Sequence, residues 1–306
     1  MKRILLYISI LIFTINQFLF ASGNLKIVTT TADLADLVRA VGGEKVKVKC
    51  LTKGNQDPHF IEPRPSMVIE VKNADAIVLI GMDLDVWIQS LIDASRNRKV
   101  VFGKDGYIDV SSGIEKLEIP SGKVDASMGD IHIYGNPHYW LDPENVKPIL
   151  NTILDRLSKL LPSESEYFKS NHKSYIQRLD SALAVWNERM KPFTNTKIVT
   201  YHNSWPYFAK RFNLKIVDFV EPKPGIPPTP SHIVSLVEKI KNEGVKVIVV
   251  EPYFNLKTAE SVAKKSGAKV VVLPTSVGGI NGINKYLDLI DYNINKLIKV
   301  LRTEEE

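Results

Sequence analysis

Short apolar segments alternate with amphipathic helical segments in two separate blocks of this chain, and this alternation constrains its fold more than any other feature. In the first block the apolar runs are LKIVT, VKVKC, ADAIVLIG and KVVFG, several of them bounded by glycine. Short, continuously apolar runs are typical of buried parallel strands. Because helical segments separate them, the block predicts an α/β lobe with a mainly parallel sheet.

The second block repeats the pattern after a long helical segment. Its apolar runs are KIVT, LKIVDF, VKVIVV and AKVVVL, and amphipathic segments at 231–244 and 255–267 lie between them. No glycine or proline interrupts the segment between Pro162 and Pro192, where apolar residues recur every three or four positions. A helix of about thirty residues spans roughly 45 Å, enough to run the length of two lobes.

The first residues have the layout of a secretory signal peptide. Lys2 and Arg3 form a basic tip, an apolar run follows over 4–20, and small residues stand at 21–23. We therefore expect cleavage near Gly23 and a periplasmic protein. The predicted division is a signal peptide at 1–23, an N-terminal α/β lobe at 24–161, a linking helix at 162–192 and a C-terminal α/β lobe at 193–306.

Composition excludes some classes of function. The 40 Lys and Arg residues, against 34 Asp and Glu, are scattered along the chain without a basic run. This distribution is typical of a solvated surface, so we expect no nucleic-acid partner. Cys50 is the only cysteine, so an intrachain disulfide is impossible and the fold depends on packing.

Three of the six histidines stand in similar local settings. His59 lies in DPHFIEP, His138 in NPHYWLDP and His202 in VTYHNSW, each after an extended segment or a turn. Open α/β sheets gather ligand-binding residues at such positions. Imidazoles that are far apart in sequence suit a metal site built between lobes rather than within one loop.

On these residues the chain resembles the solute-binding proteins of zinc and manganese ABC importers, the zinc-uptake or TroA-like family. DPHFIEPRPS and NPHYWLDPENV resemble the two N-terminal ligand motifs of that family, and His202 stands at the position of its third ligand. The resemblance covers essentially the whole mature chain. It implies two Rossmann-like lobes joined by one rigid helix, with the metal in the cleft between them.

The fourth ligand departs from the family pattern. Many members carry an aspartate where this chain has Thr275, and threonine is a poor metal ligand. We expect Glu251, at the end of the run VKVIVV, to complete the site, with water as the alternative. His132, in a loop, is a further candidate as an accessory ligand, whereas His172 and His232 are interpreted as structural.

The predicted function is capture of Zn²⁺ and its delivery to the membrane permease of an ABC importer, by a monomer without enzymatic activity. Three imidazoles suit Zn²⁺ better than Mn²⁺, which prefers oxygen ligands. A manganese-specific binding protein remains one alternative. Another is a secreted zinc-dependent hydrolase, since three histidines and an open fourth position also describe catalytic zinc. A third is an adhesin with structural metal.

Overall fold

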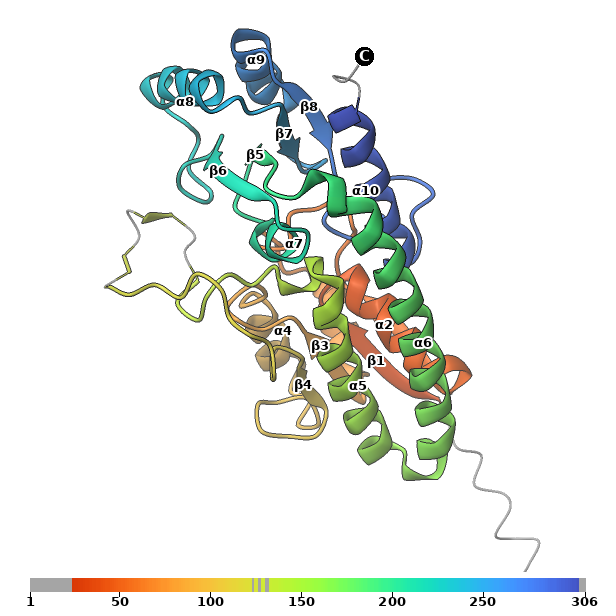
Figure 1. The fold of residues 1–306 in the computed structure, drawn as a ribbon. Coiled ribbons are helices and arrows are strands. Elements are labelled where there is room, and N and C mark those ends of the chain that lie inside the picture. Colours follow the sequence, from red (N-terminus) through yellow and green to blue (C-terminus); the bar gives the residue numbers. More distant parts are fainter. Residues whose placement is uncertain (1–23, 123, 126–127, 130–131, 303–306) are drawn as a thin grey trace, which may run out of the picture.

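The computed structural model describes residues 24–122, 124–125, 128–129 and 132–302, and the predicted signal peptide lies outside these ranges. Two parallel sheets, each flanked by helices, are stacked along the length of the molecule, and one long helix runs beside them (Figure 1). This architecture confirms the predicted α/β fold of two lobes with parallel sheets and a long connecting helix. The predicted domain boundaries themselves stay a prediction.

The first sheet has the strand order β2-β1-β3-β4, with all neighbours parallel. Strand β3 is buried at every position, as its continuously apolar sequence predicts. The elements of this part of the chain are β1 (Leu25–Thr29), α2 (Ala32–Gly42), β2 (Val46–Cys50), α3 (Pro65–Lys72), β3 (Ala76–Leu79), α4 (Ile88–Ser95), β4 (Tyr107–Asp109) and α5 (Val146–Leu160).

One predicted strand of this lobe is wrong. The run KVVFG at 99–103 forms turns, and the edge strand of the sheet is β4 instead. Val100 is the only fully buried residue of that run, and the Phe102 side chain is 83% exposed. Ile108 and Val110, by contrast, are both buried on the same side of an alternating segment. The edge position therefore belongs to the segment that supplies two core residues.

The second sheet repeats the order of the first as β6-β5-β7-β8, again with parallel neighbours only. The side chains of Thr229 and Asn255 cap its two amphipathic helices, α8 and α9. Its elements are β5 (Lys197–Thr200), α7 (Pro206–Arg211), β6 (Lys215–Phe219), α8 (Pro230–Glu243), β7 (Val247–Val250), α9 (Leu256–Ser266), β8 (Lys269–Val272) and α10 (Tyr286–Arg302).

The long helix is α6 (Ser165–Met190), with one 3₁₀ turn before it and one after it. Its 26 residues span about 39 Å, and it packs against α2 and α5 as well as α10. His172 lies between Phe168 and Tyr175 on this helix, and its Nε2 lies 2.9 Å from Oδ1 of Asn151. The apolar stripe of α6 is formed by Phe168, Tyr175, Leu179, Leu183, Trp186 and Met190.

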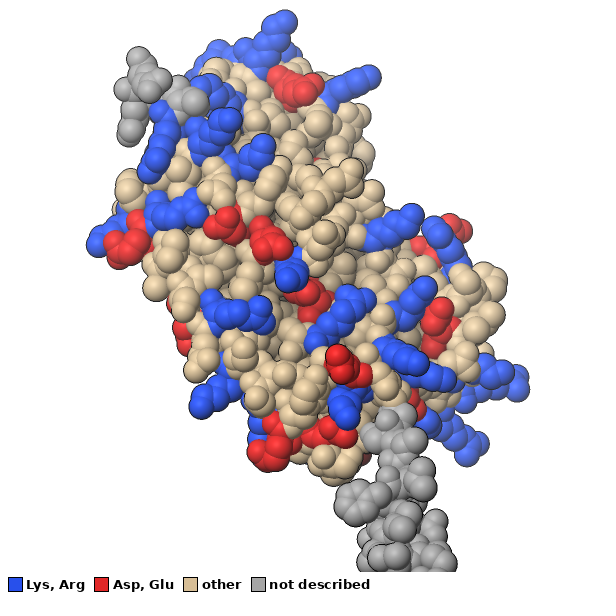
Figure 2. All heavy atoms as spheres, turned by 90° about the vertical axis from the view of Figure 1, so that its right-hand side faces the viewer, with Lys and Arg blue, Asp and Glu red and all other residues tan. Residues whose placement is uncertain are grey.

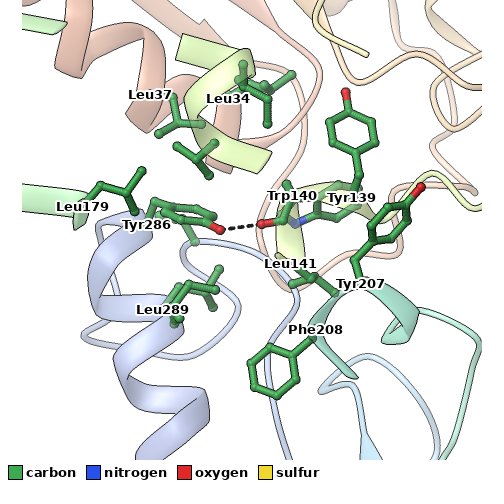
Figure 3. Close-up of a cluster of buried hydrophobic side chains, with 14 of the residues drawn as sticks. Leu34, Leu37, Tyr139, Trp140, Leu141, Leu179, Tyr207, Phe208, Tyr286 and Leu289 are labelled. Atoms are coloured by element: carbon green, nitrogen blue, oxygen red, sulfur yellow. Dashed lines mark hydrogen bonds between the residues drawn. The ribbon is translucent and has the colours of Figure 1, made fainter. Parts of the chain in front are cut away.

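A hydrophobic cluster joins the two lobes in the segment that follows His138. Figure 3 shows Trp140 between residues of α2 and residues of α7 and α10, so both halves of the chain contribute to one core. The indole Nε1 of Trp140 donates a hydrogen bond to the carbonyl of Thr275 at 2.8 Å. Tyr286 donates from its hydroxyl to the carbonyl of Trp140. The backbone beside His138 is therefore held by contacts from both lobes.

Polar contacts also connect the first lobe to the second. Arg211 of α7 donates two hydrogen bonds to the buried carboxylate of Asp142, at 2.6 and 3.0 Å. Asp33, at the first turn of α2, accepts from the backbone N–H of Val277 at 3.0 Å and from the Ser276 hydroxyl. A Cβ atom at Gly54 would overlap the backbone around Val277, so glycine permits the close approach of the loop that leads to His59.

Asp33→Asn should change how stability depends on pH. Burial raises the pKa of Asp33 from 3.8 to about 6. A raised carboxyl pKa favours folding below pH 3.8, and the contribution is lost as the pH rises through 6, a change of roughly 3 kcal/mol. An asparagine can still accept from Val277 and donate to Ser276.

Urea unfolding between pH 4 and pH 7 measures this effect, with the wild-type protein as the reference at each pH. The variant should gain stability relative to the wild type as the pH rises. A difference that stays constant across the range would show that the Asp33 carboxyl does not titrate as described.

The surface carries charges of both signs. On the face drawn in Figure 2, Lys and Arg side chains are interspersed with Asp and Glu. Among the helices of the described residues, none combines the length and apolar character that a membrane span needs.

Candidate metal centre

Three histidines from distant parts of the chain meet between the lobes. One ring nitrogen from each of His59, His138 and His202 lies within 4.8 Å of the other two. Their ring centres are 5.0 Å apart for the first pair, 5.3 Å for His59 and His202, and 5.7 Å for His138 and His202. The side chains are only a few per cent exposed, so the group forms a compact and largely buried cluster of imidazoles.

His59 follows β2 in a loop whose geometry is set by Asp57. The Asp57 carboxylate accepts from the backbone N–H of His59 at 3.0 Å and contacts its Nδ1 at 2.7 Å. Trp87 holds the same loop by donating from Nε1 to the carbonyl of Pro58 at 3.0 Å. The imidazole is thereby oriented with Nε2 directed away from Asp57.

Asn136 positions His138 in the same way. Its Oδ1 accepts from the backbone N–H of His138 and lies within hydrogen-bonding distance of Nδ1, both at 3.0 Å. Because an amide oxygen only accepts, the Nδ1 of His138 must carry the proton, which leaves the lone pair on Nε2. The Asn136 amide also donates to the carbonyl of Asn203 at 2.8 Å, so the second lobe helps to hold the ligand motif around His138.

His202 stands at the carboxyl end of β5, and its orienting group comes from the neighbouring strand. Glu221, just beyond β6, places a carboxylate oxygen 3.0 Å from the Nδ1 of His202. The hydroxyl of Thr200 donates to the carbonyl of His202 at 2.8 Å. Carboxyl ends of adjacent parallel strands lie at one edge of the sheet, which is why the pair meets across 19 residues.

All three histidines therefore use Nδ1 for an oxygen of the protein. The Nε2 atoms of His59 and His138 are buried and lack hydrogen-bond partners among the described residues. Metal-binding histidines commonly have one ring nitrogen held by a carboxylate or carbonyl oxygen, which fixes the tautomer and the ring orientation. This arrangement prepares the other nitrogen to coordinate a cation.

The protonation equilibria differ between the histidines. Burial holds the pKa of His138 well below 6.5, so its ring is neutral at physiological pH. Burial also acts against a charge on His202, but the carboxylates of Glu221 and Glu251 outweigh it and raise the pKa of His202. A proton on His202 consequently competes with a bound cation.

Glu251, predicted as the fourth ligand, lies at the end of β7 and is completely buried. Its Oε1 accepts from the indole Nε1 of Trp205 at 2.9 Å, and burial raises the pKa of its carboxyl to about 7. Neither of its carboxylate oxygens belongs to the group of donor atoms that lie within 4.8 Å of one another. Thr275 uses its carbonyl for Trp140 and places its hydroxyl 3.3 Å from the hydroxyl of Tyr253.

The orienting residues Asp57, Asn136 and Glu221 were not predicted from the sequence. The first two share a local signal, because each motif reads aspartate or asparagine, proline, histidine. A side-chain oxygen two residues before a histidine can bind that residue's backbone N–H, as in an Asx turn. Glu221 has no such signal, since its contact with His202 exists only through strand pairing.

Two further histidines lie outside the cluster. His232 is at the start of α8, where its Nε2 lies 2.9 Å from the carbonyl of Phe219, consistent with a structural role. His132 lies beside the cluster, with its ring centre 5.2 Å from that of His59.

Two α/β lobes, each with a parallel sheet, are joined by a long helix and hold a buried group of imidazoles between them. These features define a two-lobed solute-binding protein. The chain belongs to the family described as zinc-uptake complex component A, periplasmic, whose sequence model matches residues 27–300.

Curated relatives and a solved structure agree with this assignment. The zinc-binding protein AdcA of Streptococcus pyogenes serotype M6 is 26% identical over 261 residues, which are 83% of this chain and 50% of AdcA. This chain thus spans about half the length of AdcA. The metal ABC transporter substrate-binding lipoprotein ScbA of Streptococcus cristatus is 27% identical, covering 92% of this chain and 90% of ScbA. A ZnuA deletion mutant with zinc bound has a similar fold, with 25% identity, a TM-score of 0.75, and coverage of 90% and 98%.

Proposed function

We propose that this protein captures Zn²⁺ outside the cytoplasm and delivers it to the membrane permease of an ABC importer. The observation that carries the proposal is the convergence of His59, His138 and His202, each with Nδ1 engaged by an oxygen of the protein. The ion is the cargo, so the site has to bind it tightly and still release it.

Zinc is preferred over manganese because of the donor atoms. Imidazole nitrogen suits Zn²⁺, whereas Mn²⁺ favours carboxylate, carbonyl and water oxygens. The carboxylates of Asp57 and Glu221 face Nδ1 atoms and thus balance the charge of the ion through the rings. A manganese-specific protein, the first alternative, would instead need oxygen ligands in direct contact with the ion.

Glu251 stays our sequence-based prediction for the fourth ligand. Its Oε2 has no hydrogen-bond partner in the described part of the chain, and its charge acts on His202. A carboxylate there would offset one of the two charges of the ion. Chelator competition with Glu251→Gln and with Thr275→Asp tests this role, because a direct ligand should lose much of the affinity when its charge is removed.

Binding and transport are favoured over hydrolysis because the family consists of binding proteins. The test is metal analysis of the purified protein, followed by competition between Zn²⁺ and Mn²⁺. We expect about one Zn²⁺ per chain, retained against equal Mn²⁺, and no hydrolytic turnover. A deletion strain that lost manganese uptake while zinc uptake was intact would contradict the proposal, as would steady turnover of ester or peptide substrates.

A further inference from the structure

A single carboxylate oxygen contacts both lobes beside the metal centre. Glu118 lies in the loop that follows β4, and its Oε2 accepts from the side-chain amide of Asn136 at 3.0 Å. The same oxygen accepts from the side-chain amide of Asn203 at 2.8 Å. Asn136 orients His138, and Asn203 directly follows His202 in the second lobe. Glu118 therefore connects the two segments that carry these ligands.

The bond from Asn136 bears on the tautomer of His138. A carboxylate only accepts, so the NH₂ group of Asn136 has to face Glu118, and its Oδ1 then faces the Nδ1 of His138. An amide turned the other way would direct the NH₂ group at Nδ1 and favour a proton on Nε2, the nitrogen that the ion needs. Glu118 and the carbonyl of Asn203 together oppose that orientation.

The backbone around Glu118 is held by contacts from both lobes. Glu118 has a φ of 55°, in the left-handed region that is unfavourable for a residue with a Cβ atom. The hydroxyl of Tyr207, on α7, accepts from the N–H of Leu117 and donates to the carbonyl of Asn136, both at 3.0 Å. The carbonyl of Leu117 accepts from the N–H of Asn136 at 2.8 Å. Strained backbone persists only where surrounding contacts impose it, and it occurs preferentially at functional sites.

We propose that Glu118 is a positioning residue, which holds the segments around His138 and His202 together and slows the release of a bound Zn²⁺. This role rests on the proposed function of zinc capture. It is indirect, because Glu118 is not among the donor atoms that lie within 4.8 Å of one another. Its side chain is exposed, so water competes for its hydrogen bonds, and the effect should be smaller than that of removing a ligand.

Zinc dissociation kinetics and chelator competition test the role. Glu118→Ala should release Zn²⁺ about tenfold faster and bind it correspondingly more weakly, at the lower end of the range for groups that support metal ligands. Glu118→Gln keeps an oxygen that accepts from the amides and should stay within about threefold of the wild type. Glu115→Ala is the matched control, because it removes a glutamate of the same loop that pairs with Lys210 of α7 at 2.8 Å. It should leave both measurements unchanged.

A double-mutant cycle with Asn203 gives a readout that a general loss of stability would not move. The Oδ1 of Asn203 has no hydrogen-bond partner in the described ranges, so Asn203→Ala removes the contact with Glu118 and little else from its side chain. Alone, it should speed release by about threefold. Added to Glu118→Ala, it should cause no further acceleration, because the shared contact is already lost.

Unchanged release in Glu118→Ala would overturn the proposal, as would a Glu118→Gln protein impaired to the same degree as Glu118→Ala. Multiplicative effects in the double variant would also contradict it, since they would show that the two residues act independently. Circular dichroism and thermal melting of the metal-free variants establish that their folds are intact. Failure of the wild-type protein to bind Zn²⁺ would instead refute the proposed function.

Discussion

Replacing His138 with alanine is expected to lower the affinity for Zn²⁺ by about 100-fold or more. The substitution removes one of three nitrogens that converge within 4.8 Å, and a four-coordinate ion cannot replace a lost protein donor without cost. Titration against a zinc chelator of known affinity measures the change.

His172→Ala is the control for this experiment, because it also truncates a histidine but lies on α6, next to Asn151. A second variant, His138→Gln, keeps a polar side chain and helps to separate loss of the ligand from disturbance of the core around Trp140. If His138→Ala retained wild-type affinity while its fold was intact, His138 would not be a ligand and the assignment of the centre would be wrong.

Zinc affinity is expected to fall by roughly 30-fold or more between pH 8 and pH 5. The neighbouring carboxylates raise the pKa of His202 above 6.5, although burial opposes its charge. Below that pKa a proton occupies the ring, and each further pH unit costs about tenfold in affinity. His138 adds little to this dependence, since burial holds its pKa well below 6.5 and its ring is already neutral.

Glu221→Gln tests the origin of this pH dependence. The amide oxygen can still accept from Nδ1 of His202, but without the charge the pKa of His202 should fall. Losing the carboxylate charge behind the His202 ring should weaken binding by roughly 10–100-fold at pH 8, the usual effect of changing a group that supports a metal ligand. The ratio of affinities between pH 8 and pH 5 should nevertheless become smaller than in the wild type. Equal ratios in the two proteins would exclude His202 as the titrating group.

The sequence predicted the helices and strands well wherever a local pattern was strong. Helix α6 has an apolar period of three to four residues, and the apolar run at β7 is short and consists of β-branched residues, which favours a buried strand. The run KVVFG failed because periodicity alone does not decide which of two neighbouring segments pairs with β3. That choice depended on the burial of Ile108, which is a property of the packed lobe.

In the metal centre, too, some contacts follow from the local sequence and others do not. The motifs around His59 and His138 contain both the ligand and its orienting oxygen within three residues, so the chain itself determines the direction of each ring. Nothing local in the sequence connects His202 to Glu221, or His132 to His59.

What the sequence alone determined was thus the local structure: elements with a clear period, and histidines already oriented by the second residue before them. The tertiary structure decided which of these histidines meet, because parallel pairing brings the ends of β5 and β6 together and the core around Trp140 holds the lobes against each other. Short-range geometry follows from residue spacing, whereas a site between lobes depends on contacts among residues far apart in the chain, and spacing does not encode those contacts.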